Sequence, residues 1–203
     1  CEVDQFVPSA LASGLGVLAT TKDCIVVDLG GGKTDAAVFQ AGACTKVATV
    51  DVNSDHVTTD IAALIKISRE DAEAIKIGQG IADPAQVGEE EAIDVKQVGT
   101  ESARKFPRKV LSEIIESRVR EIATLVREAL VHERQPLPST ILLTGGGSQL
   151  AGTDEVFKSA FVAESVRLVS PSLVGTNSRR AAAPEMACTV GLARFVLSPE
   201  EES

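Results

Sequence analysis

Two stretches of the chain combine an apolar run with three consecutive glycines. Residues 24–27 are apolar and partly β-branched, residues 36–39 form a second apolar run, and glycines occupy positions 30–32 between them. This pattern predicts two buried strands joined by a tight hairpin. Residues 140–144 form another apolar run, and three more glycines follow at 145–147, ahead of a helical pattern. The sequence therefore predicts two units in which a buried strand leads into a glycine turn.

The rest of the chain alternates between strand-like and helical patterns. Further strands are expected at residues 45–52 and 165–169, and short strands around Ile93 and Val95. The basic stretch 104–109 is expected to lead into the longest helix. Helices are predicted over residues 3–19, 53–65, 68–78, 110–132, 151–163 and 185–197. This order of elements predicts an α/β fold with a mixed sheet and flanking helices.

The longest predicted helix has one apolar face that contains an arginine. Arg118 lies seven residues after Leu111, on the face that periodicity assigns to the core. A guanidinium at such a position needs a carboxylate partner or a path to water for its head group. It is therefore either an internal or snorkelled arginine or an exposed anchor for a partner. The apolar face comprises Leu111, Ile114, Ile115, Ile122, Leu125, Val126 and Ala129.

Composition narrows the class of protein. The formal net charge is −9, and only 3% of the residues are aromatic, so nucleic acid is an unlikely partner for this chain. The four cysteines are scattered without zinc-ligand spacing, which favours a reduced, cytoplasmic protein. No apolar run approaches the length of a membrane span, so no direct membrane segment is expected in this chain. The first residue is cysteine rather than methionine, which indicates a fragment or a processed product.

The glycine runs are candidates for anion binding. Glycine lets the backbone turn sharply and approach a ligand, and its N–H groups can face an anion. The first run matches neither the Walker spacing nor G-x-G-x-x-G, and it predicts a hairpin rather than a strand followed by a helix. A hairpin without a ligand is the simplest alternative for this run taken alone. The second run, after an independent strand, favours a shared ligand.

These motifs carry a family resemblance. Asp28-Leu-Gly-Gly-Gly-Lys-Thr-Asp35 resembles the second phosphate motif of the actin, sugar-kinase and heat-shock chaperone ATPase superfamily, and Leu143-Thr-Gly-Gly-Gly-Ser148 resembles its adenosine motif. Within that superfamily the chain is most similar to FtsA, the bacterial division actin, from about residue 3 to residue 195. Further segments resemble FtsA in the same order: residues 56–62, 71–78, 112–118 and 189–192. The resemblance covers only the second lobe of that family.

The resemblance implies a site for ATP and Mg²⁺. It assigns the β- and γ-phosphates to the first glycine run with Thr34, and the ribose and base to Glu73 and Lys76, which share a helix face. A surface ion pair is the alternative for Glu73 and Lys76. Asp28 would hold Mg²⁺ through water. The implied nucleotide-binding residues are Asp28, Gly30, Gly31, Gly32, Lys33, Thr34, Glu73, Lys76, Gly145, Gly146, Gly147 and Ser148.

The chain departs from the family pattern at three implied positions. Lys33 replaces a usual threonine, and it either adds positive charge near phosphate or projects into solvent. Asn53 and Ser54 stand where the family usually has two glycines, which predicts weaker nucleotide binding. His56 is either a catalytic base or, as is commoner for a histidine at a helix start, a cap or surface residue.

The resemblance also implies an architecture and a role. The fold is expected to be actin/ribonuclease-H-like, with a nucleotide-binding subdomain at residues 1–52 and 135–203. A smaller α+β subdomain, a candidate for partner binding, is expected at 53–134. The implied function is the ATP-binding lobe of a cell-division protein that links FtsZ filaments to the division machinery at the septum, with Arg118 contacting the FtsZ C-terminal tail.

Other interpretations remain open at this point. A lone lobe supplies half of a cleft, so at most weak ATPase activity is expected of a complete protein and none of this chain alone. The missing first lobe, or self-association, would complete the cleft. The alternatives are a non-hydrolysing module that binds a partner and a pilus-assembly protein of the actin-like group.

Overall fold

The large sheet of the protein is mixed, as predicted. The computed structural model describes residues 5–17, 21–99, 102–131, 135–171 and 180–197. Five strands lie in the order β3-β2-β1-β6-β7, where the first three pair antiparallel and β1, β6 and β7 pair parallel. The strands are β1 (Cys24–Leu29), β2 (Thr34–Gln40), β3 (Ala43–Val50), β6 (Thr140–Thr144) and β7 (Ser165–Leu168).

The strand register places both glycine runs at one edge of this sheet. Asp28 is paired with Asp35 across the hairpin of β1 and β2, and with Thr144 on the parallel strand β6. The chain leaves β1 and β6 immediately after these positions, at residues 30–32 and 145–147. Ligand sites in open parallel sheets form at the carboxyl ends of the strands. The register therefore brings the two glycine turns together at the edge where a ligand is expected.

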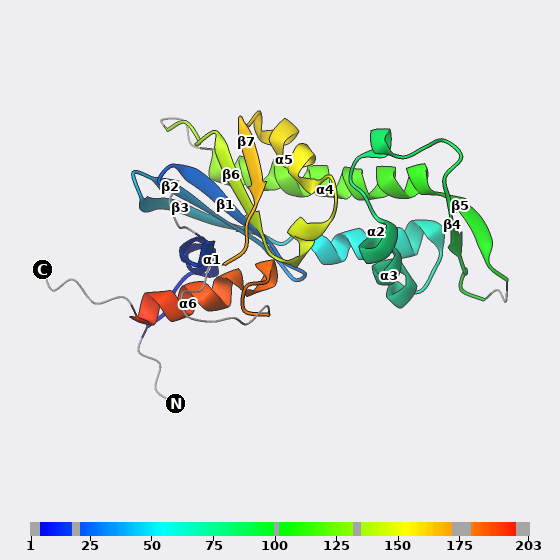
Figure 1. The fold of residues 1–203 in the computed structure, drawn as a ribbon, viewed down its shortest axis with the longest axis horizontal. Coiled ribbons are helices and arrows are strands. Elements are labelled where there is room, and N and C mark those ends of the chain that lie inside the picture. Colours follow the sequence, from blue (N-terminus) through cyan, green and yellow to red (C-terminus); the bar gives the residue numbers. More distant parts are fainter. Residues whose placement is uncertain (1–4, 18–20, 100–101, 132–134, 172–179, 198–203) are drawn as a thin grey trace, which may run out of the picture.

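Helices cover both faces of the large sheet. Alternate residues of β1 and β6 point to opposite faces: Ile25 and Ile141 pack with the residues of α4 (Arg108–Leu130) and α5 (Thr153–Phe161), whereas Val26 and Leu142 pack on the other side. Helices α1 (Ser9–Val17) and α6 (Ala187–Leu197) cover that second side. Figure 1 shows these two helices together on the face away from α4 and α5. Because both faces are covered at the centre of the sheet, β1 and β6 consist of nearly continuous apolar runs.

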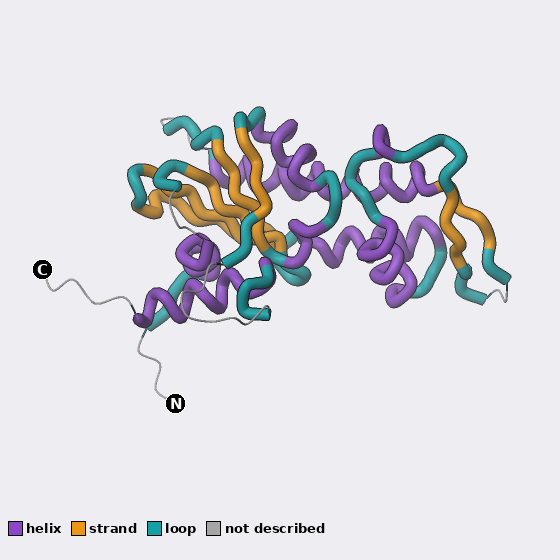
Figure 2. Tube along the Cα trace, in the orientation of Figure 1, coloured by secondary structure: helices purple, strands orange, loops and turns teal. Residues whose placement is uncertain are grey.

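A second group of elements lies at the far end of α4. It consists of α2 (Ser54–Ile65), α3 (Arg69–Gln79), the 3₁₀ turn η1 (Pro84–Gln86) and a two-stranded sheet of β4 (Ala92–Val95) and β5 (Arg104–Pro107). Figure 2 shows the strands of the molecule in two separate sets, and Figure 1 shows α4 extending from one set to the other. Apolar side chains of α4 join one core cluster that contains residues of both sets. The division at residues 53 and 134 stays a prediction.

Several predicted boundaries differ from the structure. The first helix begins at Ser9 rather than residue 3, and residues 1–4 and 18–20 lie outside the described residues. The basic stretch predicted to precede the long helix contains strand β5, whose neighbours Arg108 and Lys109 form ion pairs with Glu91 and Glu89. Ion pairs between residues far apart in the sequence leave no local signal. The second glycine run enters a 3₁₀ turn, η2 (Gly146–Gln149), and α5 starts only after Gly152, whose φ is +82°.

The apolar face of α4 is rotated slightly from the predicted one. Leu111, Ile115, Ile122 and Val126 are buried as predicted, whereas Ile114, Leu125 and Ala129 are only partly buried. The fully buried face also includes Ser112, Val119, Ala123 and Leu130. The predicted end of the helix, at residue 132, lies outside the described residues. None of the helices in the part of the chain that the structure describes is long and apolar enough to cross a bilayer.

Helices α1 and α6 cross at very short range. A Cβ atom on Gly191 would lie 1.6 Å from the carbonyl oxygen of Ala12, and one on Gly16 would lie 2.1 Å from that of Ala187. The crossing therefore has room for hydrogen only at both glycines. The guanidinium of Arg194 donates to the carbonyl oxygens of Leu15 at 2.7 Å and Gly16 at 3.1 Å, which satisfies the free end of α1.

The substitution Gly191→Ala is expected to destabilise the protein, because the added methyl group forces the two helices apart. The expected loss in the free energy of unfolding is about 1–3 kcal/mol, measured by urea denaturation. Gly78→Ala is the matched control, since a Cβ there meets no atom within 4 Å. It should leave stability unchanged or raise it by up to about 1 kcal/mol through helix propensity. Equal effects of the two substitutions would contradict this account of the crossing.

Candidate functional site

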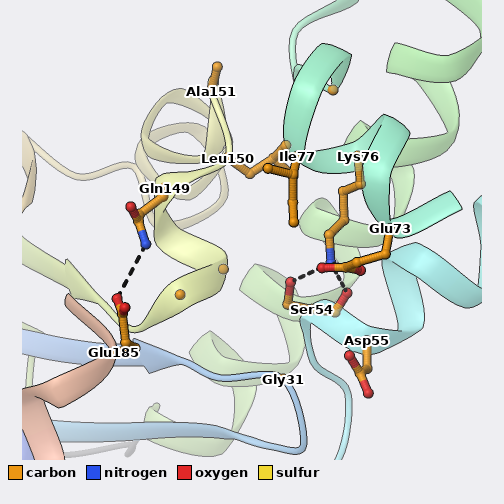
Figure 3. Close-up of a pocket in the computed structure, with 13 residues that line it drawn as sticks. Gly31, Ser54, Asp55, Glu73, Lys76, Ile77, Gln149, Leu150, Ala151 and Glu185 are labelled. Atoms are coloured by element: carbon orange, nitrogen blue, oxygen red, sulfur yellow. Dashed lines mark hydrogen bonds and ion pairs between the residues drawn. The ribbon is translucent and has the colours of Figure 1, made fainter. Parts of the chain in front are cut away.

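A pocket of about 550 Å³ lies where the two glycine turns meet helices α2 and α3. Figure 3 shows its two sides: Glu73, Lys76 and Ser54 on one, and Gln149 and Glu185 on the other. Elements far apart in the sequence thus contribute to a single cavity. Its lining residues are Gly31, Ser54, Asp55, Glu73, Lys76, Ile77, Gly80, Gly146, Gly147, Gln149, Leu150, Ala151 and Glu185.

The second glycine turn is packed tightly against the end of β1. A Cβ on Gly145, whose φ is +84°, would lie 2.3 Å from Oδ1 of Asp28, and one on Gly147 would lie 2.7 Å from Cγ of Leu29. Gly146 differs, because a Cβ there meets nothing within 4 Å. Two of the three glycines are therefore required by packing, and Gly146 presents its backbone to the open cavity.

A buried lysine joins α2 to α3 along one wall of the pocket. Nζ of Lys76 lies 2.8 Å from Oε2 of Glu73 and donates to Oγ1 of Thr58 at 2.8 Å. It also donates to the carbonyl and hydroxyl oxygens of Ser54, both at 3.3 Å. Thr58 in turn donates to the Glu73 carboxylate. Every donor of Lys76 is engaged, so its charge is held in one place.

The Glu73 carboxylate keeps its negative charge at this wall. Burial by itself raises the pKa of Glu73, but hydrogen bonds from Lys76 and Thr58 and the positive charge of Lys76 outweigh it and lower the pKa below its usual value. The Glu73 side chain is 41% exposed, whereas that of Lys76 is 8% exposed. This wall therefore presents an accessible carboxylate to the pocket, with a buried ammonium group behind it. The carboxylate can accept hydrogen bonds from ligand hydroxyls.

The opposite side of the pocket carries a polar pair, and apolar side chains lie between the two sides. Nε2 of Gln149 donates to Oε2 of Glu185 at 3.4 Å. Ile77, which is 75% exposed, and Leu150 supply apolar surface near Ala151. Figure 3 shows Ile77 and Leu150 close to each other, between the two polar walls. Such a mixture suits a ligand with a flat apolar part and polar edges.

Two aspartates lie side by side at the root of the first glycine turn. Asp28 accepts a hydrogen bond from the hydroxyl of Ser13 at 2.5 Å. Asp35 accepts from Ser9 at 2.7 Å and from Thr49 at 2.6 Å, and pairs with Lys33 at 2.9 Å. Like charges directly across two strands oppose each other, and these hydroxyls and Lys33 offset that repulsion. Lys33 folds back onto Asp35 and Ser9 with half of its side chain exposed, and its contribution of charge near a phosphate stays a prediction.

The two aspartates have opposite pKa shifts. Burial raises the pKa of Asp28, and the charge of Asp35 adds to that effect beyond what Ser13 and Lys33 offset. Burial also raises the pKa of Asp35, but hydrogen bonds from Thr49, Ser9 and Lys33, with the charge of Lys33, lower it overall. The environment thus favours the charged form of Asp35 and disfavours that of Asp28.

Five of the implied site residues line the cavity: Gly31, Glu73, Lys76, Gly146 and Gly147. The structure places the others around it rather than on its surface. Their hydroxyl groups are used within the fold, since Thr34 donates to the carbonyl of Val52 at 2.8 Å and Ser148 to that of Gly145 at 2.7 Å. The implied residues outside the lining are Asp28, Gly30, Gly32, Lys33, Thr34, Gly145 and Ser148.

Sequence reasoning missed most of the residues on the polar and apolar walls. Gln149, Leu150 and Ala151 follow directly after the second glycine turn, so their position in the sequence was a usable signal. Ile77 lies in the helix that already carried Glu73 and Lys76, and Asp55 lies between Ser54 and His56, which the sequence had singled out for other reasons. Glu185 comes from a distant segment and had no local signal. It is placed by Pro184, whose carbonyl accepts hydrogen bonds from the Gly145 amide and the Thr144 hydroxyl.

The start of α2 shows what replaces the family's glycine pair. The amide of Asn53 donates to Nδ1 of His56 at 3.3 Å, and its side chain accepts from the amide of Asp55 at 3.0 Å, which forms a capping box. His56 is therefore a capping residue and does not line the cavity. Ser54 is buried, and its Cβ lies 2.8 Å from where a Cβ on Gly147 would stand. A side chain at position 54 thus closes part of the wall.

Arg118 has an internal partner. Its Nε lies 2.6 Å and its Nη2 3.1 Å from the two carboxylate oxygens of Asp60 on α2, and it also pairs with Glu121. The side chains of Arg118 and Asp60 are 23% and 27% exposed. The bidentate pair explains how an arginine is tolerated on this face of α4. Arg118 does not line the cavity, and its contact with a partner stays a prediction.

Comparison with known proteins identifies the family. The family model described as "Cell division protein FtsA" matches residues 25–191. The FtsA of Escherichia coli (strain K12) is 32% identical over 206 residues, which cover 96% of this chain and 49% of that protein. The FtsA of Pseudomonas aeruginosa is 36% identical over 165 residues, which cover 79% of this chain and 40% of that protein. The chain spans about half the length of the curated relatives it matches.

The fold has neighbours among solved structures. MreB5 of Spiroplasma citri bound to ADP superposes with a TM-score of 0.69 at 19% identity, over 92% of this chain and 58% of that one. This likeness confirms the predicted actin-like fold and, at such low identity, only the fold. The sequence match, which includes β1, the first glycine turn and the second, goes further: the chain belongs to the FtsA family of cell-division proteins.

Proposed function

We propose that this chain is the ATP-binding lobe of an FtsA-like cell-division protein. One observation carries the proposal: the two glycine turns, which lie more than a hundred residues apart in the sequence, and the Glu73–Lys76 pair border one cavity. The exposed carboxylate of Glu73 suits ribose hydroxyls, and the surface of Ile77 and Leu150 suits a base. The open backbone at Gly31 and Gly146 suits phosphate groups. MreB5 of Spiroplasma citri, which has a similar fold, is bound to ADP, and this favours a nucleotide as the class of ligand.

The residues present fit a water-mediated magnesium ion. Within the described ranges, no group of three or more His, Cys, Asp or Glu side chains could hold a metal ion directly. Mg²⁺ commonly keeps several water ligands and uses one or two carboxylates. Asp28 would hold it through water, because its Oδ2 is bonded to Ser13 and its Oδ1 faces the second glycine turn. The ion would supply positive charge that offsets that of the phosphates.

The proposed partner is the C-terminal tail of FtsZ, with residues 53–134 as the partner-binding subdomain and the division septum as the location. Family membership favours this role over pilus assembly. A non-hydrolysing binding module remains the second candidate function. This second function is favoured by the charge of the pocket, since among the described residues only Lys76 brings a positive charge to its lining. Stabilising a transferring phosphoryl group takes cations that this wall does not provide.

The nucleotide proposal predicts that the chain binds Mg²⁺–ATP and that a side chain at position 146 blocks it. A Cβ on Gly146 meets no atom within 4 Å, so in Gly146→Leu the side chain is expected to extend into the cavity, the fold should persist, and ATP affinity should fall at least tenfold in isothermal titration calorimetry. Gly78→Leu is the control, because it adds the same side chain on α3 outside the cavity lining. If the unmodified chain shows no heat of binding with Mg²⁺–ATP, the nucleotide proposal is wrong.

We predict that Asp28→Asn weakens Mg²⁺-dependent ATP binding without lowering the stability of the fold, because the pKa of Asp28 is raised. A carboxyl group whose pKa is higher in the folded state costs stability when ionised, so above the raised pKa the neutral variant should unfold at an equal or higher temperature. This difference should shrink as the pH falls through the raised pKa of Asp28. The Mg²⁺-dependent part of ATP binding should weaken about tenfold, or about 1.4 kcal/mol.

Asp35→Asn is the matched control for Asp28→Asn. The pKa of Asp35 is lowered in the fold, so its ionised form contributes stability above its unfolded pKa and loses that contribution as the pH falls through the lowered pKa. The variant should therefore unfold at a lower temperature at neutral pH and approach the unmodified protein in acid. Thermal scans between neutral and acidic pH check both signs. If Asp28→Asn unfolds at a lower temperature than the unmodified protein at neutral pH, the raised pKa of Asp28 is refuted.

The partner proposal predicts that neutralising Arg118 weakens binding of an FtsZ tail peptide. In the double variant Arg118→Gln with Asp60→Asn, both members of the pair lose their charge, so neither is left buried and unpaired. The expected result is a folded protein that binds the peptide at least tenfold more weakly by fluorescence anisotropy. Arg120→Gln, on an exposed i,i+4 pair with Glu116, is the control. An unchanged peptide affinity in the double variant would make Arg118 purely structural.

A further inference from the structure

The charge of the pocket opposes the ligand that its shape suits. Three carboxylates, those of Asp55, Glu73 and Glu185, and a single ammonium group, that of Lys76, are found among the described residues that line it. The ammonium group is already paired with Glu73 at 2.8 Å. A free polyphosphate entering this cavity therefore meets a wall with a formal charge of −2. Shape alone does not explain how such a ligand would bind.

Among the carboxylates that line the pocket, Asp55 is the one that approaches Gly31 in the first glycine turn. It lies in the first turn of α2, and a Cβ on Gly31 would stand 3.6 Å from its Oδ1. Figure 3 shows Asp55 at the end of the pocket that carries Gly31. The start of a helix ordinarily favours an anion, because its free N–H groups and dipole are positive there. At α2 this place already has a carboxylate, which competes with an incoming phosphate.

The carboxylate of Asp55 pairs with Arg69, and the pair is open to solvent. Nη2 of Arg69, at the start of α3, lies 2.8 Å from Oδ2 of Asp55, and Nη1 of Arg69 donates to Oγ1 of Thr59 at 2.9 Å. The side chains of Arg69 and Asp55 are 57% and 54% exposed. Exposed pairs of this kind are weakly coupled and screened by salt. Asp55 therefore stays effective as a negative charge toward Gly31.

We infer that Asp55 makes this pocket select the magnesium chelate of a nucleoside polyphosphate over the metal-free polyanion. The inference rests on the proposed nucleotide site and deepens it. Chelation by Mg²⁺ removes two negative charges from the polyphosphate, which lowers its repulsion by Asp55, whereas the metal-free form keeps the full repulsion. Asp55 acts as a specificity-determining residue through its charge, and Arg69 tunes that charge from outside the cavity.

The experiment compares ATP affinity in excess Mg²⁺ with affinity in EDTA, by calorimetry at low ionic strength. Asp55→Asn keeps the size of the side chain and removes its charge. It should reduce the ratio of the dissociation constant in EDTA to that in Mg²⁺ at least fivefold, chiefly by tightening the binding of metal-free ATP. Arg69→Gln exposes the carboxylate of Asp55 and should raise the ratio. Glu70→Gln is the matched control, because Glu70 follows Arg69 on α3 and lies outside the cavity lining. The substitution also removes one negative charge, and it should leave the ratio within twofold.

The outcomes separate this inference from the proposed function. Binding of Mg²⁺–ATP with an equal ratio in Asp55→Asn and the unmodified chain overturns the role of Asp55 and leaves the nucleotide site standing. Equal reductions in Asp55→Asn and Glu70→Gln also overturn it, since they indicate a diffuse charge effect rather than a local one. Absence of Mg²⁺–ATP binding in the unmodified chain removes the proposed function and this inference together. Circular dichroism of each variant verifies that a changed ratio comes from a folded protein.

Discussion

The parallel pairing of β1 with β6 is the constraint on which the rest of the site depends. It sets Asp28 beside Thr144, and one residue farther along Leu29 packs against Gly147. A shift of one residue in this register would turn every buried side chain of β6 to the opposite face, so the two covered faces of the sheet lock it. The glycine turns meet because the strands that lead into them cannot slide.

The second wall of the pocket depends on a different kind of interaction. Helices α2 and α3 are held to each other by the buried ammonium group of Lys76, which contacts both Ser54 and Thr58 on α2 and Glu73 on its own helix. Removing one member of a buried, fully bonded group leaves the others unsatisfied. The same residues therefore keep the wall rigid and present the Glu73 carboxylate to the cavity. Arg118 and Asp60 tie α2 to α4 in a similar way, on a face outside the cavity lining.

Local sequence signals predicted the helices and strands of this fold better than they predicted which distant residues contact one another. Apolar runs and glycines placed β1, β2 and β6, and the spacing of Glu73 and Lys76 placed both on one helix face, because these features are encoded within a few residues. Strand β5 was missed because its Lys105 pairs with Asp94 on β4, and the next residue after the strand, Arg108, pairs with Glu91; no local pattern reports these pairs. The same limit applies to Glu185, because its partner Gln149 is 36 residues away and no periodicity reports such a contact.

The two glycine turns also show why a glycine motif is weak evidence for a ligand by itself. Gly145 and Gly147 have no room for a side chain, because β1 occupies the space, so a protein that bound nothing would need glycine there too. At Gly146, by contrast, a side chain would fit, and the backbone faces an open cavity. Packing does not account for glycine at that position. The evidence for a ligand therefore lies in Gly146 and in its position opposite Glu73 and Lys76, rather than in the motif as a whole.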